Sequence, residues 1–334
     1  MNEAPEKVFD LIVIGAGPAG MTAAFEAGKH GIDYLVLEKG LLANTVYQYP
    51  IGLTVFSTPD ELEIEPGALS SMTGKPTREQ LLSYYVRFVR EKKLNIQTGE
   101  QVTRVRQQGD LFSVETDKTE YRCRKLIFAI GAMDHPRKLN VPGEGLSKVH
   151  HVFKETYPWV GKKAMVIGGG NSAGEAALFL AQEGVETTIA IFRSDWENAD
   201  PKQGCIKYWV KEPLEQEREV GCLTVFFLKS VKEITESEIV LEAEDGSEKR
   251  FDNDVVFVLI GSDADLRLMK SLGIKFGKSK YGEIPIYDPV NFQTEVKGIY
   301  TIGHFTEQRH ISGAINAARS AVAHLAQSSG EGIR

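Results

Sequence analysis

The chain has 334 residues, of which 42% are hydrophobic and 25% charged, so it is long enough for two globular domains with substantial cores. Its net charge is −7 and it has no run of Lys and Arg, which argues against nucleic acid as a partner. No stretch approaches 18 continuous apolar residues and the N-terminus lacks a signal pattern, so we expect a cytosolic protein without a membrane partner.

A glycine-rich turn opens the first predicted nucleotide-binding unit. Residues 9–14 form a buried parallel strand, Gly15-Ala16-Gly17-Pro18-Ala19-Gly20 follows, and residues 19–30 form a helix rich in alanine. Gly15 permits the tight turn, Gly17 lets a phosphate approach the backbone, and Gly20 lets the helix pack on the strand. The free N–H groups of the helix would then face a pyrophosphate. A lone glycine turn of this kind also occurs in ordinary α/β proteins.

A second strand strengthens the prediction. Residues 34–37 end at Glu38, where a carboxylate can accept hydrogen bonds from both hydroxyls of a ribose. A turn-rich segment, 41–76, follows, and then a helix over residues 77–92 with apolar side chains at helical spacing. Short alternating strands predict a small antiparallel layer on the parallel sheet, around residues 95–96, 102–106, 112–116 and 121–130. The last of these strands runs into a small-residue turn at Gly131.

A second unit repeats this arrangement with one informative difference. Residues 163–167 form a strand, Gly168-Gly169-Gly170-Asn171-Ser172-Ala173 is the turn, and residues 172–183 form a helix. The next strand, 185–192, ends in Arg193 rather than in an acid. A guanidinium can bind a 2′-phosphate through two hydrogen bonds, whereas a carboxylate would repel it, so the unit favours NADPH over NADH. A solvated surface arginine is the alternative interpretation.

The ends of both units recur later in the chain. Residues 255–261 close the second unit at Gly261, and residues 298–303 lead to Gly303 and a helix from about 311 to 326. This repetition predicts two similar modules, the second inserted into the first. We therefore expect an α/β fold of two Rossmann-like nucleotide-binding domains, an outer one of residues 1–148 and 263–334 and an inserted one of residues 149–262.

The nested order of these motifs resembles the low-molecular-weight thioredoxin reductases, which bind FAD in the outer domain and NADPH in the inserted one. Several stretches resemble, within that group, the bacillithiol disulfide reductases of the YpdA family: Glu38-Lys39-Gly40, Tyr47-Gln48-Tyr49-Pro50, Phe56-Ser57, Leu62-Glu63-Ile64, Leu82-Ser83-Tyr84-Tyr85, His151-Val152-Phe153-Lys154-Glu155 and Ile206-Lys207-Tyr208-Trp209. The resemblance implies an oxidoreductase that passes electrons from NADPH through flavin to a small disulfide, and a homodimer.

The motifs and the resemblance together predict the cofactor-binding residues. The FAD residues are Gly15, Gly17, Pro18, Ala19, Gly20, Glu38, Lys39, Tyr47, Val102, Gly131, Gly303, His304 and Ile311. The NADPH residues are Gly168, Gly170, Asn171, Ser172, Ala173, Arg193 and Gly261. No metal site is predicted, because the adjacent His150 and His151 point in opposite directions in an extended chain.

The cysteines depart from the family patterns. Thioredoxin reductases carry a Cys-x-x-Cys where this chain has His151 and Lys154, so thioredoxin reduction by the usual exchange route is excluded. Bacillithiol-type reductases carry a cysteine inside the first glycine turn, where this chain has Ala19. The residue to which a mixed disulfide would be assigned is therefore missing. Of the three cysteines, Cys123 and Cys222 are expected in the core, and Cys205 is the candidate reactive thiol, with Lys202 and Lys207 nearby.

Other features leave the acceptor open. His304 follows Gly303 where thioredoxin reductases usually have an aspartate, and His310 precedes the last helix; both are candidates to stand near the flavin or to be polar loop residues. Ferredoxin or flavodoxin reductases share the nested fold without a dithiol and hand electrons to a small redox protein. A flavin monooxygenase or oxidase, and a flavin sensor without catalysis, are further alternatives. The catalytic residues are unknown at this stage.

Overall fold

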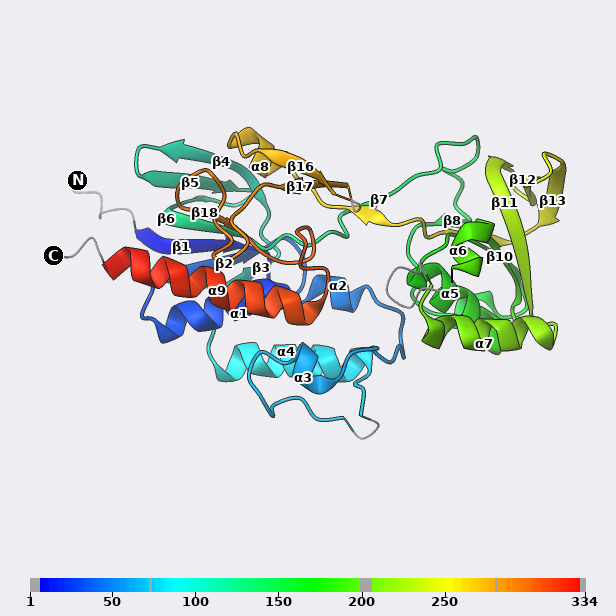
Figure 1. Ribbon diagram of the computed structural model, residues 1–334, viewed down its shortest axis with the longest axis horizontal. Helices are drawn as coiled ribbons and strands as arrows, with labels where there is room; N and C mark the ends of the chain where they lie inside the picture. Colours follow the sequence, from blue (N-terminus) through cyan, green and yellow to red (C-terminus); the bar gives the residue numbers. More distant parts are fainter. Residues whose placement is uncertain (1–6, 72–73, 199–205, 280–281, 331–334) are drawn as a thin grey trace. The chain divides into compact units, whose positions relative to one another are not determined.

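The computed structural model describes residues 7–71, 74–198, 206–279 and 282–330, which fold into two compact units (Figure 1). The chain passes between the units at residues 135/136 and 262/263, so one unit is inserted into the other. The first boundary differs from the expected one at 148/149. Leu139, Val141 and Leu146 pack into a core of the inserted unit, and the N–H of Ile234 donates to the carbonyl of Pro142 at 2.9 Å. This segment therefore belongs to the inserted unit.

The outer unit is built on a parallel sheet of order β3-β2-β1-β6, with β18 also paired to β6. Its strands are β1 (Val8–Ile14), β2 (Tyr34–Glu38), β3 (Ile96–Thr98), β6 (Glu120–Phe128) and β18 (Ile299–Thr301). β6 belongs to two layers, because its first half pairs antiparallel with β5 (Leu111–Thr116), and β5 pairs with β4 (Val102–Gln108). The predicted antiparallel layer is thus present.

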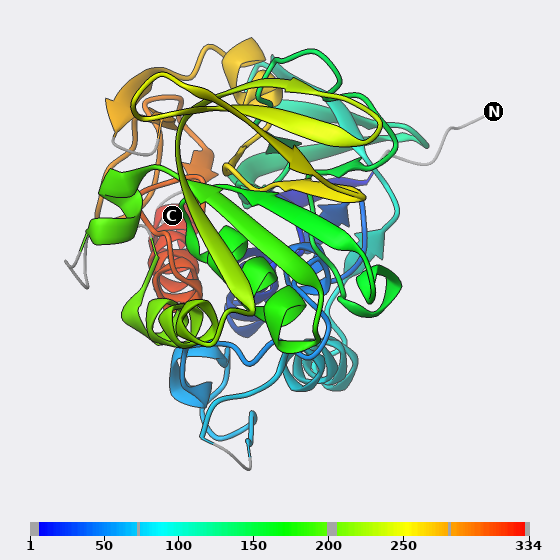
Figure 2. The same ribbon diagram turned by 90° about the vertical axis from the view of Figure 1, so that its right-hand side faces the viewer.

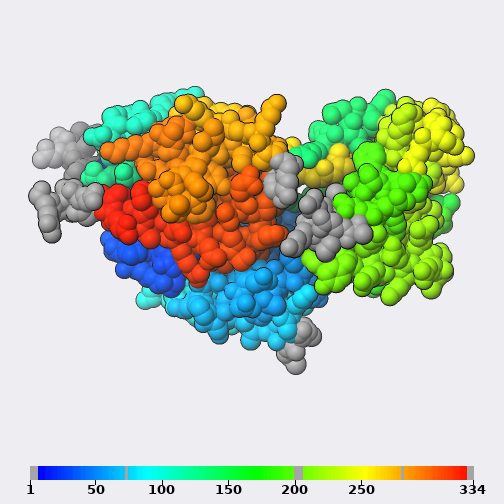
Figure 3. Space-filling view, viewed as in Figure 1, coloured from blue at the N-terminus to red at the C-terminus, as the bar shows by residue number. Residues whose placement is uncertain are grey.

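Two alanine-rich helices, α1 (Pro18–Lys29) and α9 (Ile311–Gly330), pack against each other on one face of this sheet (Figures 1 and 3). Their buried residues include Ala23, Ala24, Ala318 and Ala321, none of which has measurable exposure. Small side chains let the helices approach the strands closely. The antiparallel strands and α8 (Arg267–Ser271) cover the opposite face.

A separate layer covers the outer side of α1 and α9. It contains α2 (Asn44–Tyr47), α3 (Pro59–Leu62) and α4 (Arg78–Glu91), which share a core with Met21 and Ile315. α4 begins at a capping box, in which the side chain of Thr77 accepts from the N–H of Gln80 and the Gln80 side chain accepts from the N–H of Thr77. β16 (Phe276–Ser279) and β17 (Gly282–Pro285) form a small antiparallel pair.

The inserted unit repeats the parallel core of the outer one. Its sheet has the order β13-β12-β11-β10-β9-β14-β8 (Figure 2). The strands are β8 (Val149–His150), β9 (Lys163–Ile167), β10 (Glu186–Ile191), β11 (Leu223–Ile234), β12 (Glu238–Ala243), β13 (Glu248–Asp252) and β14 (Val255–Val258). α5 (Asn171–Gln182) and α7 (Tyr208–Glu219) pack on one face. The short elements are η1 (Tyr157–Trp159), α6 (Arg193–Glu197) and the strands β7 (His135–Pro136) and β15 (Ser262–Asp263), which pair with each other.

Candidate functional site

The first glycine turn has the backbone geometry that its sequence predicts. Gly15 has φ +109°, and a Cβ there would stand 2.4 Å from the carbonyl oxygen of Ala129 on the neighbouring loop. A Cβ on Gly20 would stand 1.9 Å from the carbonyl oxygen of Gly15. Gly17 differs, because a Cβ there would meet nothing within 4 Å. The turn is therefore packed on two sides and open at Gly17, where α1 begins without a side-chain cap.

Glu38 is fixed beside this turn by the backbone. Glu38 is 7% exposed, and its carboxylate accepts hydrogen bonds from the N–H of Ala16 at 2.8 Å and the N–H of Gly40 at 2.7 Å. One bond goes to each carboxylate oxygen, which sets the plane of the group. Each oxygen keeps a further lone pair for a ligand hydroxyl.

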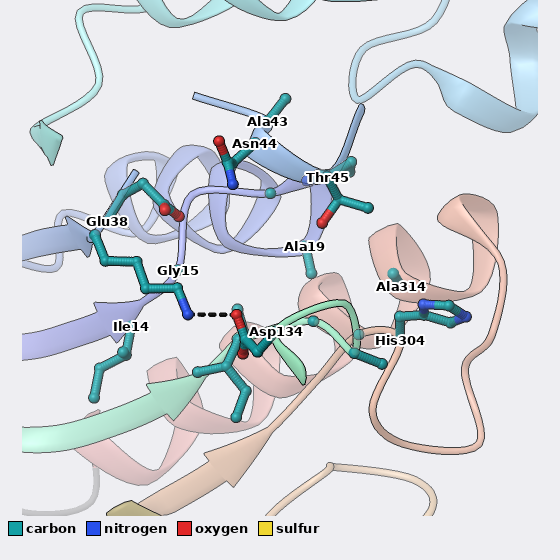
Figure 4. Close-up of a pocket in the computed structure, with 18 of the residues that line it drawn as sticks. Ile14, Gly15, Ala19, Glu38, Ala43, Asn44, Thr45, Asp134, His304 and Ala314 are labelled. Carbon is teal, nitrogen blue, oxygen red and sulfur yellow. Dashed lines mark hydrogen bonds and ion pairs between the residues drawn. The ribbon is translucent and has the colours of Figure 1, made fainter. Parts of the chain in front are cut away.

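A pocket in the outer unit collects most of the predicted FAD residues (Figure 4). Those that line it are Gly15, Gly17, Pro18, Ala19, Glu38, Lys39, Val102, Gly131, Gly303, His304 and Ile311. Two predicted residues do not. Gly20 is buried beneath the turn, and Tyr47 lies on α2 with its ring 5.4 Å from the guanidinium carbon of Arg78.

Sequence reasoning missed several residues of this pocket. They are Asn44, Thr45, Val46, Tyr49, Glu100, Asp134, Asp265, Arg309 and Ala314, among others, whereas His310, a candidate from the sequence, does line the pocket. The short helix α2 contributes the first three and follows Ala43, which has φ +50°. The one signal available was the position of Asp134 and Arg309 just beyond the glycine turns at Gly131 and Gly303, where the carboxyl ends of the parallel strands meet.

Charged side chains lie around the pocket. The ammonium of Lys39, from the end of β2, forms an ion pair with the carboxylate of Asp134, from the loop after β6 (Figure 4). The same carboxylate accepts from the N–H of Asp265 at 3.4 Å. Hydrogen bonds from Arg267 lower the pKa of Asp265 to about 2, so this carboxyl is ionised at neutral pH.

His304 adds an uncharged imidazole. Burial, together with the nearby Arg309 and His310, lowers its pKa to about 4. The ring is therefore neutral at pH 7, with one nitrogen that donates and one that accepts. α9 begins one residue after His310, and Ile311 and Ala314 of its first turn line the pocket.

Neither of the two cysteines in the described part of the chain lines this pocket. Cys123 is buried in β6, where burial raises the pKa of its thiol to about 12, as expected for a core residue. Cys222 was expected in the core but is exposed, because it lies one residue before β11, whose first residue, Leu223, is buried. Cys205, the candidate reactive thiol, and Lys202 lie outside the described residues. Ala19 lines the pocket and is 5% exposed.

The second glycine turn repeats the backbone of the first. Gly168 has φ +148°, and a Cβ there would stand 2.3 Å from the carbonyl oxygen of Leu259, the same relation that links Gly15 to Ala129. Gly170 is open to space on its Cβ side, and α5 begins after it without a side-chain cap. Asn171 accepts from the N–H of Lys207 at 2.8 Å. Ser172 is exposed at the start of α5, Ala173 is fully buried in the core, and Gly261 lies beside Arg137.

Arg193 follows β10, as predicted, and lines a shallow surface pocket of the inserted unit with Phe192, Ser194, Glu197, Leu228, Lys229 and Glu244. Its guanidinium is held by the carboxylates of Glu244 and Glu197, and these hydrogen bonds raise its pKa. Among the residues that the structure describes, no group of His, Cys, Asp and Glu side chains could hold a metal ion. No described helix combines the length and apolar character that a bilayer crossing requires.

Comparison with known proteins agrees with this architecture. A family model described as "Pyridine nucleotide-disulphide oxidoreductase" matches residues 12–303, and the chain belongs to that family of enzymes. Within the family it is a flavoprotein oxidoreductase of the low-molecular-weight thioredoxin reductase-like group, similar to the bacillithiol disulfide reductases.

Three relatives document this similarity. "Bacilliredoxin reductase Bdr" of Bacillus subtilis is 35% identical over 293 residues, which cover 87% of this chain and 88% of the relative. The structure "Bacillithiol Disulfide Reductase Bdr (YpdA) from Staphylococcus aureus" has a TM-score of 0.89 and 31% identity, with 98% of this chain and 100% of that chain covered. "Ferredoxin--NADP reductase" of Ignicoccus hospitalis is 30% identical over 309 residues, which cover 89% of this chain and 90% of the relative.

Proposed function

We propose that this protein is an FAD-dependent NADPH oxidoreductase whose acceptor is a low-molecular-weight disulfide such as bacillithiol disulfide. The observation that carries the proposal is the pocket of the outer unit, in which an open glycine turn, an uncapped helix and a buried acid converge. The name of the Staphylococcus aureus structure, a bacillithiol disulfide reductase, supports the disulfide. We place this activity in the cytosol and in a homodimer.

The outer pocket has the features that an FAD molecule needs. The space beside Gly17 and the first N–H groups of α1 suit a pyrophosphate, which binds at helix N-termini. The buried carboxylate of Glu38 suits a ribose diol, because two backbone N–H groups fix its position. Neutral His304 and the first turn of α9 line the same pocket and offer a hydrogen-bond donor and a positive helix end.

The second glycine turn is the corresponding site for NADPH. We infer that the N–H groups at the start of α5 receive its pyrophosphate, and that Arg193 receives the 2′-phosphate. A flavin bound in the outer unit would supply two-electron transfer from reduced nicotinamide to the acceptor. With a disulfide as acceptor, those electrons, one proton from the hydride and one from solvent give two thiols and NADP⁺.

An anaerobic experiment tests the proposal. The purified protein should be yellow, and one equivalent of NADPH should bleach its flavin absorbance. Bacillithiol disulfide is then mixed in, and the absorbance should return within the time of a turnover. The exposed thiol of Cys222 could exchange with a disulfide by itself, so Cys222→Ser is the matched control. The flavin absorbance of this variant should return at the same rate as that of the wild-type protein. Flavin that stays reduced in both proteins would rule out this acceptor.

Electron transfer to a small redox protein is the second candidate function. Two observations favour it: Ala19 stands at the pocket without a cysteine beside it among the described residues, and a ferredoxin–NADP reductase is 30% identical over nearly the whole chain. The same experiment distinguishes the two functions when ferredoxin or flavodoxin is added to the reduced protein in place of the disulfide and the flavin absorbance is followed. Reoxidation by the redox protein, and not by the disulfide, would establish the second function.

A further inference from the structure

Arg193 is already bound by two carboxylates. Its Nε lies 2.8 Å from one oxygen of Glu244 and 3.2 Å from the other, and its Nη2 lies 2.8 Å from Glu244. Its Nη1 donates to Glu197 at 3.1 Å. The guanidinium also lies 4.0 Å from the ring centre of Phe227. Each of its three nitrogens therefore has a carboxylate partner, and one face of the group is stacked.

The two carboxylates come from different elements and reach the same cation. Glu197 ends α6 one turn after Arg193, and Glu244 directly follows β12, 51 positions along the chain. The pocket around them has two cations, Arg193 and Lys229, and two anions, Glu197 and Glu244. Lys229 is itself paired with Glu242 at 2.8 Å. A phosphate that enters this pocket meets no excess of positive charge.

We propose that Glu244, assisted by Glu197, determines the nucleotide specificity of this site by occupying the donors of Arg193 that a 2′-phosphate would use. This inference rests on the proposed function of the inserted unit. NADPH must displace the Glu244 carboxylate or bind beside it, where two like charges repel. The 2′-hydroxyl of NADH carries no charge and can donate to that carboxylate. The preference for NADPH is thus smaller than Arg193 alone would give.

Binding of nucleotide halves tests the proposal without any electron transfer. The probes are 2′,5′-ADP, which carries the 2′-phosphate, and 5′-AMP, which carries the free hydroxyl. Calorimetric titration of the full-length, FAD-loaded protein gives both dissociation constants. Glu244→Gln should tighten 2′,5′-ADP about threefold, and Glu244→Gln with Glu197→Gln about tenfold, the effect expected for exposed ion pairs. Neither change should tighten 5′-AMP.

A matched control separates local pairing from a change in net charge. Glu238 is the first residue of β12 and pairs with Arg250, but it does not line the pocket. Glu238→Gln should leave both dissociation constants unchanged. In an Arg193→Ala background, Glu244→Gln should lose most of its effect, because the partner that it releases is gone.

The outcomes distinguish this inference from the function on which it rests. If NADPH reduces the flavin but Glu244→Gln binds 2′,5′-ADP no better than Glu238→Gln does, the inference is wrong and the function stands. An equal gain with and without Arg193 would also overturn the inference. If neither the wild-type protein nor the Glu244→Gln variant binds 2′,5′-ADP, both the inference and the proposed function are wrong.

Discussion

Replacing Glu38 by glutamine tests whether the outer pocket binds the ribose of a dinucleotide. Both carboxylate oxygens accept backbone N–H groups, from Ala16 at 2.8 Å and from Gly40 at 2.7 Å, in a site where the residue is 7% exposed. Glutamine keeps one carbonyl oxygen and turns an NH₂ group toward the other backbone N–H. One buried donor thus loses its acceptor, and the charge that would attract the ribose hydroxyls is removed.

The size of the effect follows from these contacts. A hydrogen bond to a charged group contributes about 1.5–3 kcal/mol, and an unsatisfied buried donor costs about 1–3 kcal/mol. The apoprotein should therefore lose on the order of 2–4 kcal/mol of unfolding free energy. Loss of the bond to the ribose should weaken FAD binding further, by about 10- to 100-fold.

Glu63 provides the control, because it is buried and bound by backbone N–H groups as Glu38 is, but it lies outside the pocket. It is 9% exposed and accepts the N–H groups of Gly67 at 2.8 Å and of Ala68 and Leu69 at 3.0 Å, yet it does not line the pocket. Glu63→Gln should lower the thermal midpoint of the apoprotein by a similar amount. In a fluorescence titration with FAD, Glu63→Gln should bind FAD with near wild-type affinity, whereas Glu38→Gln should bind it more weakly. Equal FAD affinity in the two variants would refute the assignment of Glu38.

Three further predictions follow from individual residues. Gly15→Ala should prevent folding of the outer unit, whereas Gly17→Ala should keep the thermal midpoint and weaken FAD binding, because only the second has room for a Cβ; similar midpoints for both variants would contradict this. Burial lowers the pKa of His304 to about 4, so between pH 6.5 and 4 the unfolded chain binds more protons than the folded one. Stability should therefore fall by up to about 3 kcal/mol as the pH falls through that window. Thermal midpoints measured across the window should fall less steeply in His304→Gln than in the wild-type protein, and parallel curves would contradict the buried, neutral imidazole. Native Cys222 should react with a thiol reagent and Cys123 should not, and Cys123→Ser with Cys222→Ser should leave flavin reduction intact; a folded variant that NADPH no longer reduces would show that a thiol takes part.

The glycine turns made the nested fold predictable because their requirements are local. Gly15 and Gly168 both need a positive φ and a missing Cβ next to a neighbouring strand, and few other motifs share that pair of constraints. The strands and helices beside them fall within a few residues of the expected positions. α7 was missed, because Pro213 lies inside it and its apolar positions are few.

Long-range relations were not predictable. The segment around Leu139 and Val141 precedes β8 in the chain, and its place in a core that includes Ile234 and Ile239, from strands much later in the chain, assigns it to the inserted unit. The partner of Arg193 is a similar case. Glu244 lies 51 positions away, so the sequence identified a free cation where the structure has a paired one. Sequence patterns specify what a residue can bind, and the tertiary fold decides what is already bound.

The two sites differ in a way that matches their proposed roles. Glu38 is held by backbone N–H groups in a buried position, so its geometry is fixed before any ligand arrives. The side chain of Arg193 is 46% exposed and is held by two other flexible side chains, which a ligand can displace. A preformed, buried site suits a cofactor that stays through every turnover. An exposed site with exchangeable partners suits a nucleotide that must bind and leave in each cycle. The fold thus uses one backbone motif twice, and under the proposed function the residue at the end of the second strand, Glu38 in one unit and Arg193 in the other, distinguishes the flavin site from the nicotinamide site.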